Sequence, residues 1–588
     1  MLKLLRNLNK KDILFLTIAT ALVVLQVFLE LKMPDYMSEI TVLVQTPGSQ
    51  MGDILKNGGY MLACAFASLL SSIVVGYITA NFAANLSLKI RKNIFTKVQD
   101  IAISEIKSFS TSSLVTRTTN DITQVQMFMA MGLQLIIKAP ITAVWAITKI
   151  MGKSWQWSMV TAIGVVILLA VVITLMIIVI PRFKKVQRLT DKINGVTREN
   201  LTGIRVVRAF NAEKYQENKF EEANAKLTNQ QLFNQRAFSV MSPVMYLIMY
   251  FLTLAIYVIG ANLISQAGLA DKVSIFGDMI VFSSYSMQII MSFLMLAMIF
   301  MMWPRAEVSA KRINEVLDTE ITIKDGKIDR DTTGKIGEVE FKNVSFKYPD
   351  AEENILENIS FKANKGETIA FIGSTGSGKS TLINLVPRFY DATSGEVLVD
   401  GVNIKDYTQK YLHSKIGYVS QKAVIFNDTV SNNVAYGDDL KGEISKDSVK
   451  KAIEVAQAKD FVEKMENGYD TDMARGGTNV SGGQKQRISI ARAISRKPEI
   501  YIFDDTFSAL DYKTDSVLRK ALREYTKNAT ILIVAQRIGT IMNADKIIVL
   551  DEGKIVGMGK HKELLENCEV YKQIALSQLS KEELEENE

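Results

Sequence analysis

Cysteine and histidine are scarce in this chain of 588 residues, which contains only two of each. Cys64 and Cys568 are separated by most of the sequence, so neither a disulfide framework nor a cysteine-rich metal site is indicated. Charged residues are also sparse, at 22% against 48% hydrophobic residues. A large soluble protein can approach these averages, so composition alone does not place the chain in a membrane.

The distribution of charge is more informative than its amount. The net charge of +7 is modest, and the basic residues cluster beside apolar runs, as Lys10 and Lys11 do before the first run and Arg182 and Lys185 do after a later one. Nucleic-acid binding would require a basic face on a folded domain, so we expect no nucleic-acid partner. No small-residue cleavage site accompanies the first apolar run, which we therefore expect to be a retained membrane span.

Long stretches with almost no charge recur through the first 310 residues. A helix needs roughly 20 apolar residues to cross a bilayer, and only helices or closed barrels satisfy their backbone groups there. A single run of this kind could be a buried helix of a soluble protein, but six in succession favour a six-helix transmembrane domain. The expected spans are about 12–32, 57–88, 122–150, 154–181, 237–268 and 276–304.

The basic segments give the expected orientation. Lysine and arginine collect on the cytoplasmic side of membrane proteins, which places the N-terminus and the long polar connections 89–121 and 182–236 in the cytoplasm. We expect a multi-pass protein of the cell (plasma) membrane whose soluble part is also cytoplasmic. The expected domains are a transmembrane domain at 1–310 with long cytoplasmic helix extensions, a linker at 311–336, a soluble domain at 337–580 and an acidic tail at 581–588.

A glycine-rich phosphate-binding loop lies near the start of the soluble part, where residues 371–381 read FIGSTGSGKST. An apolar strand, a glycine loop and a helix start follow one another, so backbone N–H groups can face phosphates. Lys379 can reach the β- and γ-phosphates, and the Ser380 hydroxyl can bind Mg²⁺. The residues predicted to bind ATP here are Gly373, Ser374, Thr375, Gly376, Ser377, Gly378, Lys379, Ser380 and Thr381.

Two further segments add to this loop. Residues 500–505 read IYIFDD, an apolar run that would bring Asp504 to the Mg²⁺ ion, and they lie about 125 residues after the loop. Residues 480–484 read VSGGQ, which a plain phosphate-loop enzyme does not need. The glycines and serine suit a helix N-terminus offered to another phosphate group, although taken alone the segment could be a glycine-rich turn.

Taken together, these segments resemble the ATP-binding cassette (ABC) family, in particular exporters that fuse a six-helix membrane domain to one nucleotide-binding domain. The similarity extends over essentially the whole chain. It implies an all-α six-helix transmembrane domain followed by an α/β P-loop domain, with ATP and Mg²⁺ as cofactors. It also implies that two such domains enclose two ATP molecules, each held by one subunit's phosphate loop and the other's signature motif.

The resemblance assigns further roles. Tyr348 corresponds to the aromatic residue that stacks on adenine, although in isolation it reads as a strand residue, and Gln421 to the glutamine that touches Mg²⁺ and senses the membrane domain. Coupling helices are expected near 108–116 and 208–214. The signature motif comprises Val480, Ser481, Gly482, Gly483 and Gln484, the D-loop Ser508, Ala509, Leu510 and Asp511, and the expected metal ligands Ser380, Gln421 and Asp504.

Two catalytic positions depart from the family pattern. Asp505 stands where the family has a glutamate base, and Gln536 stands where it has a histidine. The shorter carboxylate must still come within hydrogen-bond reach of its proton, and the neutral amide cannot carry positive charge towards the transition state. The histidines of this chain, His413 and His561, lie outside the motifs and are no obvious substitutes.

Either change alone could be drift, but both beside an intact loop predict a degenerate site that hydrolyses ATP slowly. A homodimer would then contain two impaired sites. We therefore expect a heterodimer, in which this chain supplies its signature motif to a second half-transporter that has the catalytic glutamate and histidine. The chain would thus be a transport ATPase with hydrolysis mainly at the partner's site.

The methionines of the last two spans bear on the cargo. Methionines such as Met245, Met249, Met291 and Met295 recur at helical spacing in the last two spans, which suits a cavity for drugs or amphipathic lipids but equally suits packing between helices or against membrane lipid. Lys138 should face a cavity, where it could attract an anionic head group, or an acid on the other subunit. The alternatives to an exporter are an ATP-gated regulator or channel and a soluble ABC-type ATPase, against which the six spans argue.

Overall fold

The computed structural model describes residues 2–5, 9–46, 48–151, 153–268, 271–437 and 442–579. The chain forms two compact units. The first comprises Met1–Val98 and Thr111–Asp318, and the second comprises Gln99–Ser110 and Thr319–Glu588. The second unit therefore contains a short segment from the N-terminal half of the sequence.

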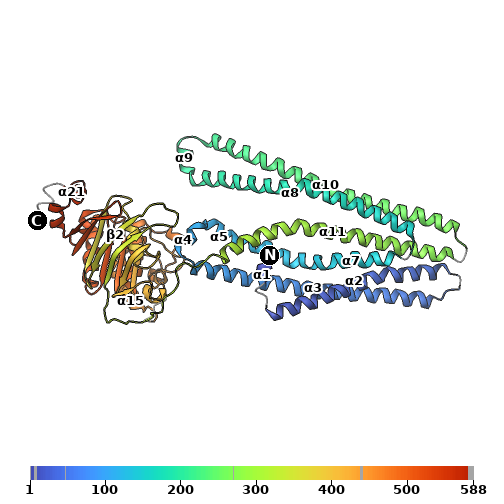
Figure 1. The fold of residues 1–588 in the computed structure, drawn as a ribbon, viewed down its shortest axis with the longest axis horizontal. Coiled ribbons are helices and arrows are strands. Elements are labelled where there is room, and N and C mark those ends of the chain that lie inside the picture. The colour runs from blue at the N-terminus through green and yellow to red at the C-terminus, as the bar shows by residue number, and fades with distance from the viewer. Residues whose placement is uncertain are drawn as a thin grey trace. The chain divides into compact units, whose positions relative to one another are not determined.

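The first unit is a bundle of long helices (Figure 1). Among the described residues, six helical stretches are long and apolar enough to cross a membrane. Several continue well beyond a bilayer: α3 alone has 50 residues, about 75 Å at 1.5 Å per residue, against a hydrocarbon core of about 30 Å. The stretches are α2 (Lys10–Gln45), α3 (Met51–Asp100), α5 to α7 (Thr111–Ile150), α8 (Trp155–Thr202), α10 (Glu213–Gln266) and α11 (Asp271–Leu317).

The third of these stretches is not one regular helix. It consists of α5 (Thr111–Thr118), α6 (Asn120–Met127), a π-helical turn η1 (Phe128–Gly132) and α7 (Leu133–Ile150). A short helix, α1 (Leu2–Leu5), precedes α2. Helices α8 and α10 lie side by side along much of their length.

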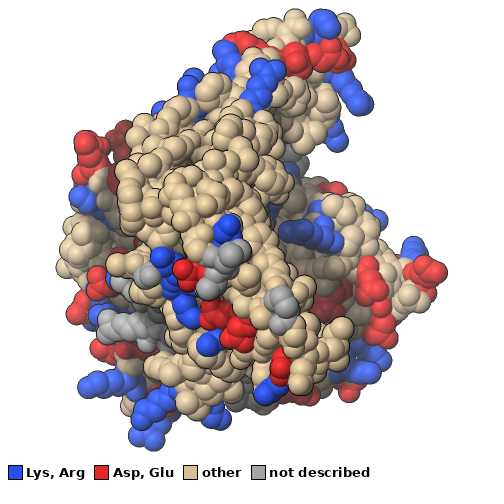
Figure 2. Space-filling view, turned by 90° about the vertical axis from the view of Figure 1, so that its right-hand side faces the viewer, with Lys and Arg blue, Asp and Glu red and all other residues tan. Residues whose placement is uncertain are grey.

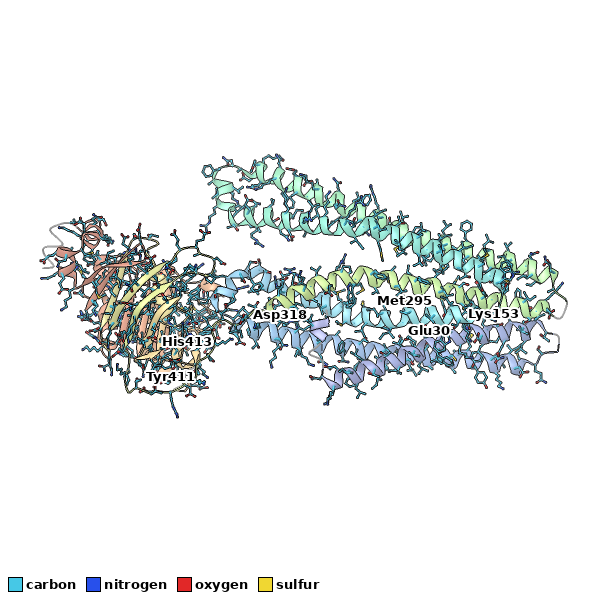
Figure 3. The ribbon with its side chains drawn as sticks, viewed as in Figure 1. Glu30, Lys153, Met295, Asp318, Tyr411 and His413 are labelled. Carbon is cyan, nitrogen blue, oxygen red and sulfur yellow. The ribbon has the colours of Figure 1, made fainter. Side chains whose placement is uncertain are left out.

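Lys138 forms an ion pair inside this bundle. Its ammonium lies 2.9 Å from Glu30 Oε1, so α7 is connected to α2 of the same chain. Gln26 also donates to Glu30 Oε1 at 2.9 Å, and the Ser68 hydroxyl of α3 lies 3.4 Å from it. Lys138 thus contacts an acid of its own chain, which differs from the two partners expected for it from the sequence. Glu30 is labelled in Figure 3.

A second polar contact follows further along α2. Lys149 of α7 donates to Asp35 Oδ2 at 2.7 Å, and the Tyr285 hydroxyl of α11 lies 2.6 Å from Asp35 Oδ1. Lipid tails are as apolar as leucine side chains, so apolar packing alone holds membrane helices together weakly. The carboxylates of Glu30 and Asp35 therefore fasten α2 to its neighbours.

Charged residues of both signs also occur at the end of the bundle where the helices turn. Figure 2 shows acidic and basic side chains beside one another there, among a majority of uncharged residues. Lys153 and Asp278 form an ion pair that connects the α7–α8 turn to α11. Lys153 is labelled near this end in Figure 3.

The second unit is built on two sheets. A four-stranded antiparallel sheet has the order β2-β1-β4-β5, and a six-stranded sheet has the order β10-β9-β3-β8-β7-β6, parallel except for β10. The strands are β1 (Val339–Phe346), β2 (Leu356–Ala363), β3 (Thr368–Gly373), β4 (Ser394–Val399), β5 (Val402–Asn403), β6 (Ile416–Val419), β7 (Ile500–Asp504), β8 (Thr530–Val534), β9 (Lys546–Asp551) and β10 (Lys554–Gly559).

The central strands of the larger sheet are nearly continuous apolar runs because both of their faces are covered. All five residues of β7 and of β8 are buried, as expected for parallel strands between two layers. The helices of this unit that frame the site are α12 (Lys379–Leu385), α17 (Gly482–Ser495) and α18 (Tyr512–Tyr525). The other described helices of this unit are α4 (Ile103–Ser108), α13 (Gln409–Ser414), α14 (Val430–Val434), α15 (Lys446–Val455), α16 (Lys459–Val462), α19 (Ile538–Ile541), α20 (His561–Asn567) and α21 (Glu569–Leu576), with 3₁₀ turns η2 (Gly468–Asp470) and η3 (Arg475–Gly477).

The architecture confirms the fold class predicted from the sequence, a six-helix transmembrane domain followed by an α/β domain. The short helices in the long connections differ in position from the sequence prediction. They are α4 (Ile103–Ser108) and α9 (Ile204–Ala209), which begin five and four residues earlier than the predicted 108–116 and 208–214. Helix α4 ends where Phe109 adopts an extended conformation, and α5 then begins at Thr111.

Replacing Lys138 with methionine should destabilise the helix bundle. The substitution leaves the Glu30 carboxylate without its cation in a poorly hydrated site, which costs up to about 3 kcal/mol. The double variant Glu30→Gln/Lys138→Met should recover most of this loss, because neither charge is then left unpaired. The measurement is the midpoint of thermal unfolding of the protein in nanodiscs.

Lys92→Met is the matched control, because Lys92 is an exposed lysine of α3. An equal loss of stability in the single and double variants would show that the ion pair does not fasten the two helices.

Candidate nucleotide-binding site

The glycine-rich loop connects β3 to α12, as its sequence predicts. Gly376 and Gly378 adopt left-handed φ values of 90° and 93°, which glycine reaches without steric cost. Gly373 is required for another reason: a Cβ atom there would lie 2.0 Å from the Leu550 carbonyl oxygen of β9. The loop therefore fits only because these positions have no side chain.

Lys379 lies at the centre of this loop. Its ammonium donates to the Gly373 and Ser374 carbonyl oxygens at 2.9 and 2.7 Å, and lies 3.3 Å from Ser377 Oγ. Burial lowers the pKa of Lys379, while the negative charges of Asp505 and Asp504 oppose that shift. A cation is thus held among backbone groups, as phosphate binding requires.

Ser380 and Asp504 provide oxygen atoms suited to Mg²⁺. The Ser380 hydroxyl donates to Asp504 Oδ1 at 2.7 Å, which joins the start of α12 to the end of β7. Burial raises the pKa of Asp504, the nearby Asp505 adds to the shift, and Ser380 and Lys379 counteract it. Within the described ranges no cluster of three His, Cys, Asp or Glu side chains could hold a metal. The pair fits Mg²⁺, because Mg²⁺ takes one or two protein oxygens together with substrate phosphates.

Asp505 and Gln536, the two unusual residues, are in contact. Gln536 donates to Asp505 Oδ2 at 2.8 Å, and Gln421 donates to the same oxygen at 3.1 Å. Asp505 is itself constrained, with a φ of 46° and only 7% exposure, and its N–H donates to the Val534 carbonyl at 3.0 Å. Gln421 and Gln536, from two other segments of the sequence, therefore converge on the short carboxylate of Asp505.

Tyr348 lies just beyond β1 and is half-buried. Its ring packs edge-to-face with Phe346 and Tyr390, with centroids 4.9 and 5.3 Å apart. Its hydroxyl lies 3.0 Å from Thr381 Oγ1. An aromatic ring is thus connected directly to the helix that follows the phosphate loop.

The signature segment caps helix α17. The Gln484 N–H donates to Ser481 Oγ at 3.3 Å, and the Ser481 N–H donates to Gln484 Oε1 at 2.9 Å, which is a capping box. Val480 packs against the apolar core. A Cβ atom on Gly482 would meet no atom within 4 Å, so the first turn of α17 is open on that side.

The D-loop lies against the signature segment. A Cβ atom on Gly483 would be 3.4 Å from the Ala509 carbonyl oxygen and 3.5 Å from Leu510. Ser508 donates to the Asp505 carbonyl at 2.9 Å. Asp511 caps α18 by accepting from the Thr514 N–H at 2.9 Å, a hydrogen bond that lowers the Asp511 pKa. The D-loop thus connects the end of β7, which Asp505 follows, to helix α17.

The two histidines lie in other surroundings. His413 Nε2 is 2.8 Å from the Pro387 carbonyl oxygen, and His561 Nδ1 is 2.6 Å from the Tyr571 hydroxyl. Burial lowers the pKa of both imidazoles. These contacts give neither histidine a part in the cluster around Asp505.

Sequence reasoning missed two residues near Tyr348. Tyr390 is buried beside it, and the ammonium of Lys107 in α4 lies 5.5 Å from the centre of the Tyr348 ring. No local pattern could have placed Lys107 here, because its segment reads as a polar connection between membrane helices.

Comparisons with known proteins agree with this geometry. Residues 356–508 match the family described as ABC transporter, and residues 16–293 match the family described as ABC transporter transmembrane region. The chain is 37% identical over 549 residues to an ABC transporter ATP-binding protein of Mycobacterium tuberculosis, covering 92% of this chain and 93% of that protein.

Two other similar proteins have more specific descriptions. An ATP-dependent lipid A-core flippase of Aliivibrio fischeri is 32% identical over 533 residues, which is 90% of this chain and 89% of the flippase. The structure of a bacterial Atm1-family ABC exporter with ATP bound aligns with a TM-score of 0.77 at 24% identity, covering 97% and 98% of the two chains. At that identity the structural likeness supports the fold alone.

Replacing Gly373 with alanine should disrupt the loop. The new methyl group would have to displace the Leu550 carbonyl of β9, at a cost of about 1–3 kcal/mol, and the displaced loop should lose ATP affinity. Thermal unfolding and isothermal titration with an ATP analogue measure the two effects. Gly482→Ala is the control for stability, since its methyl group enters open space. Unchanged affinity in Gly373→Ala would contradict the role given to this close approach.

Proposed function

The chain belongs to the ABC transporter family, as a multi-pass membrane protein and an ATPase coupled to transport, and from this premise we propose that it is the ATP-retaining subunit of a heterodimeric exporter. In this proposal a second half-transporter carries out most of the hydrolysis. The signature segment Val480–Gln484 of this chain completes the partner's competent site.

The pairing of Asp505 with Gln536 is the observation that carries the proposal. A general base must lie within about 2.6–3.2 Å of the proton that it accepts, and loss of a positioned base costs on the order of 10²–10⁴-fold in rate. Asp505 is one methylene shorter than glutamate, and its Oδ2 already accepts two amide N–H groups. Gln536 is neutral and cannot add the positive charge that stabilises a transition state.

The parts needed for binding are retained. Lys379 and the glycines of the loop would bind the ATP phosphates. Ser380 and Asp504 would hold Mg²⁺, which neutralises phosphate charge when bound. Tyr348 would stack on adenine. The capped first turn of α17 is open beside Gly482, which suits contact with a phosphate held by another chain. A site that binds well and hydrolyses slowly keeps two nucleotide domains engaged between cycles.

An amphipathic substrate is the second part of the proposal. Met291 and Met298 of α11 are 45% and 43% exposed, and flexible thioether side chains adapt to varied apolar shapes. The relative from Aliivibrio fischeri is named a lipid A-core flippase, which supports a lipid or drug of similar chemistry. Met245 and Met279 are buried, so part of the methionine-rich region serves packing between helices.

Restoring the two family residues should activate the isolated chain. We expect Asp505→Glu/Gln536→His to raise the ATPase rate of the purified protein by about 10²-fold or more, because the base regains its length and its partner can carry charge. Steady-state phosphate release in nanodiscs measures this rate.

Lys379→Met in the same background is the control, since it should abolish the gain if the restored activity uses this phosphate loop. A wild-type chain that alone hydrolyses ATP as fast as the double variant would refute the degenerate site and, with it, the need for a catalytic partner.

A further inference from the structure

Helix α4 belongs to the membrane half of the sequence but to the second unit of the structure. The chain leaves the first unit through α3, places Gln99–Ser110 in the second unit, and returns through α5. Helix α4 is therefore connected covalently to the long helix α3 at one end and to α5, the first part of the third membrane stretch, at the other.

Three residues of α4 contact the rest of the second unit. Ile103 packs on the apolar cluster that includes Tyr348 and Tyr390. Glu105 Oε1 accepts from the Thr322 hydroxyl at 2.5 Å. The Lys107 ammonium lies 5.5 Å from the centre of the Tyr348 ring and 5.6 Å from that of Tyr390.

The contact of Lys107 with the two rings is electrostatic. A cation within about 6 Å of an aromatic centroid is attracted by the ring quadrupole, more strongly where water is excluded. A hydrogen bond with Tyr390 raises the pKa of Lys107, against the opposing effect of burial, so the side chain stays charged. One ammonium group of α4 thus contacts both tyrosine rings.

Tyr348 extends this contact to the phosphate loop. Its hydroxyl lies 3.0 Å from Thr381, in the first turn of α12, and adjacent Ser380 contacts Asp504. Side-chain contacts therefore connect Lys107 of α4 through the Tyr348 ring to Thr381, the sequence neighbour of the candidate magnesium ligand Ser380.

We propose that Lys107 is a positioning residue for the nucleotide base: it holds the Tyr348 ring for stacking and thereby makes the packing of α4 depend on the bound base. The inference rests on the proposed stacking of adenine on Tyr348. Coupling of this kind is reciprocal, so a base that orders Tyr348 strengthens the contact with α4 to the same extent that Lys107 strengthens base binding. The phosphates are bound by other groups and should not report the loss of Lys107.

The test compares a ligand that has the base with one that lacks it. The affinities of the full-length protein in nanodiscs for a non-hydrolysable ATP analogue and for inorganic tripolyphosphate, both with Mg²⁺, are measured by isothermal titration. We expect Lys107→Met to weaken binding of the ATP analogue about two- to fivefold and to leave tripolyphosphate unchanged. Lys107→Arg should restore the affinity to within about twofold, because arginine also binds aromatic faces.

Two further variants separate the possible failures. Lys365→Met removes an exposed lysine of the same unit and should behave as wild type, while Tyr348→Ala should weaken only the ATP analogue. Wild-type affinity in Lys107→Met beside weakened binding in Tyr348→Ala overturns the role of Lys107 and leaves the nucleotide site intact. Wild-type affinity in both variants overturns the stacking role of Tyr348, and weakened tripolyphosphate binding in Lys107→Met shows a general structural defect instead.

Hydrogen exchange tests the reciprocal effect. The ATP analogue should slow amide exchange in residues 103–108 of the wild-type protein and of Lys107→Arg, but not in Lys107→Met. Equal protection in all three proteins would show that α4 does not respond to the base through this side chain.

Discussion

The alignment of three parallel strands determines the chemistry of the nucleotide site. Val534 of β8 pairs with Phe371 of β3 on one side and with Asp504 of β7 on the other, so the three strands end at one edge of the sheet. The phosphate loop begins two residues after Phe371, Asp505 follows Asp504 directly, and Gln536 lies two residues after Val534. A one-residue slip of β7 or β8 would separate the short carboxylate from its amide partner, which makes strand register the first requirement of the site.

The sequence predicted the fold class and the parts of the site that are contiguous. The loop at 373–381 and the capping residues Ser481 and Asp511 could be placed because each motif contains its own structural requirements: glycines for positive φ, and side-chain oxygens for helix starts. The contacts of Asp505 with Gln421 and of Lys107 with Tyr348 could not be predicted, because they depend on packing between segments more than 80 residues apart.

The two units satisfy their polar groups in different ways. In the second unit, buried polar groups contact one another around a strand edge, as Ser380 and Asp504 do. In the first unit, the carboxylates of Glu30 and Asp35 accept hydrogen bonds from three other helices, where lipid supplies neither water nor a hydrophobic driving force. Charged residues in the spans are therefore structural elements of the bundle as well as candidates for contact with cargo.

Because Gln99–Ser110 belongs to the second unit, the protein cannot be cut once in the sequence to give two complete units. A fragment that begins at Thr319 would contain every nucleotide motif and yet lack Ile103 and Lys107, which contact its aromatic cluster, and Glu105, which accepts from Thr322. Such a fragment would expose an apolar surface that the intact chain covers. The second unit is therefore discontinuous in sequence, and part of it is a peptide that is synthesised more than 200 residues before the rest.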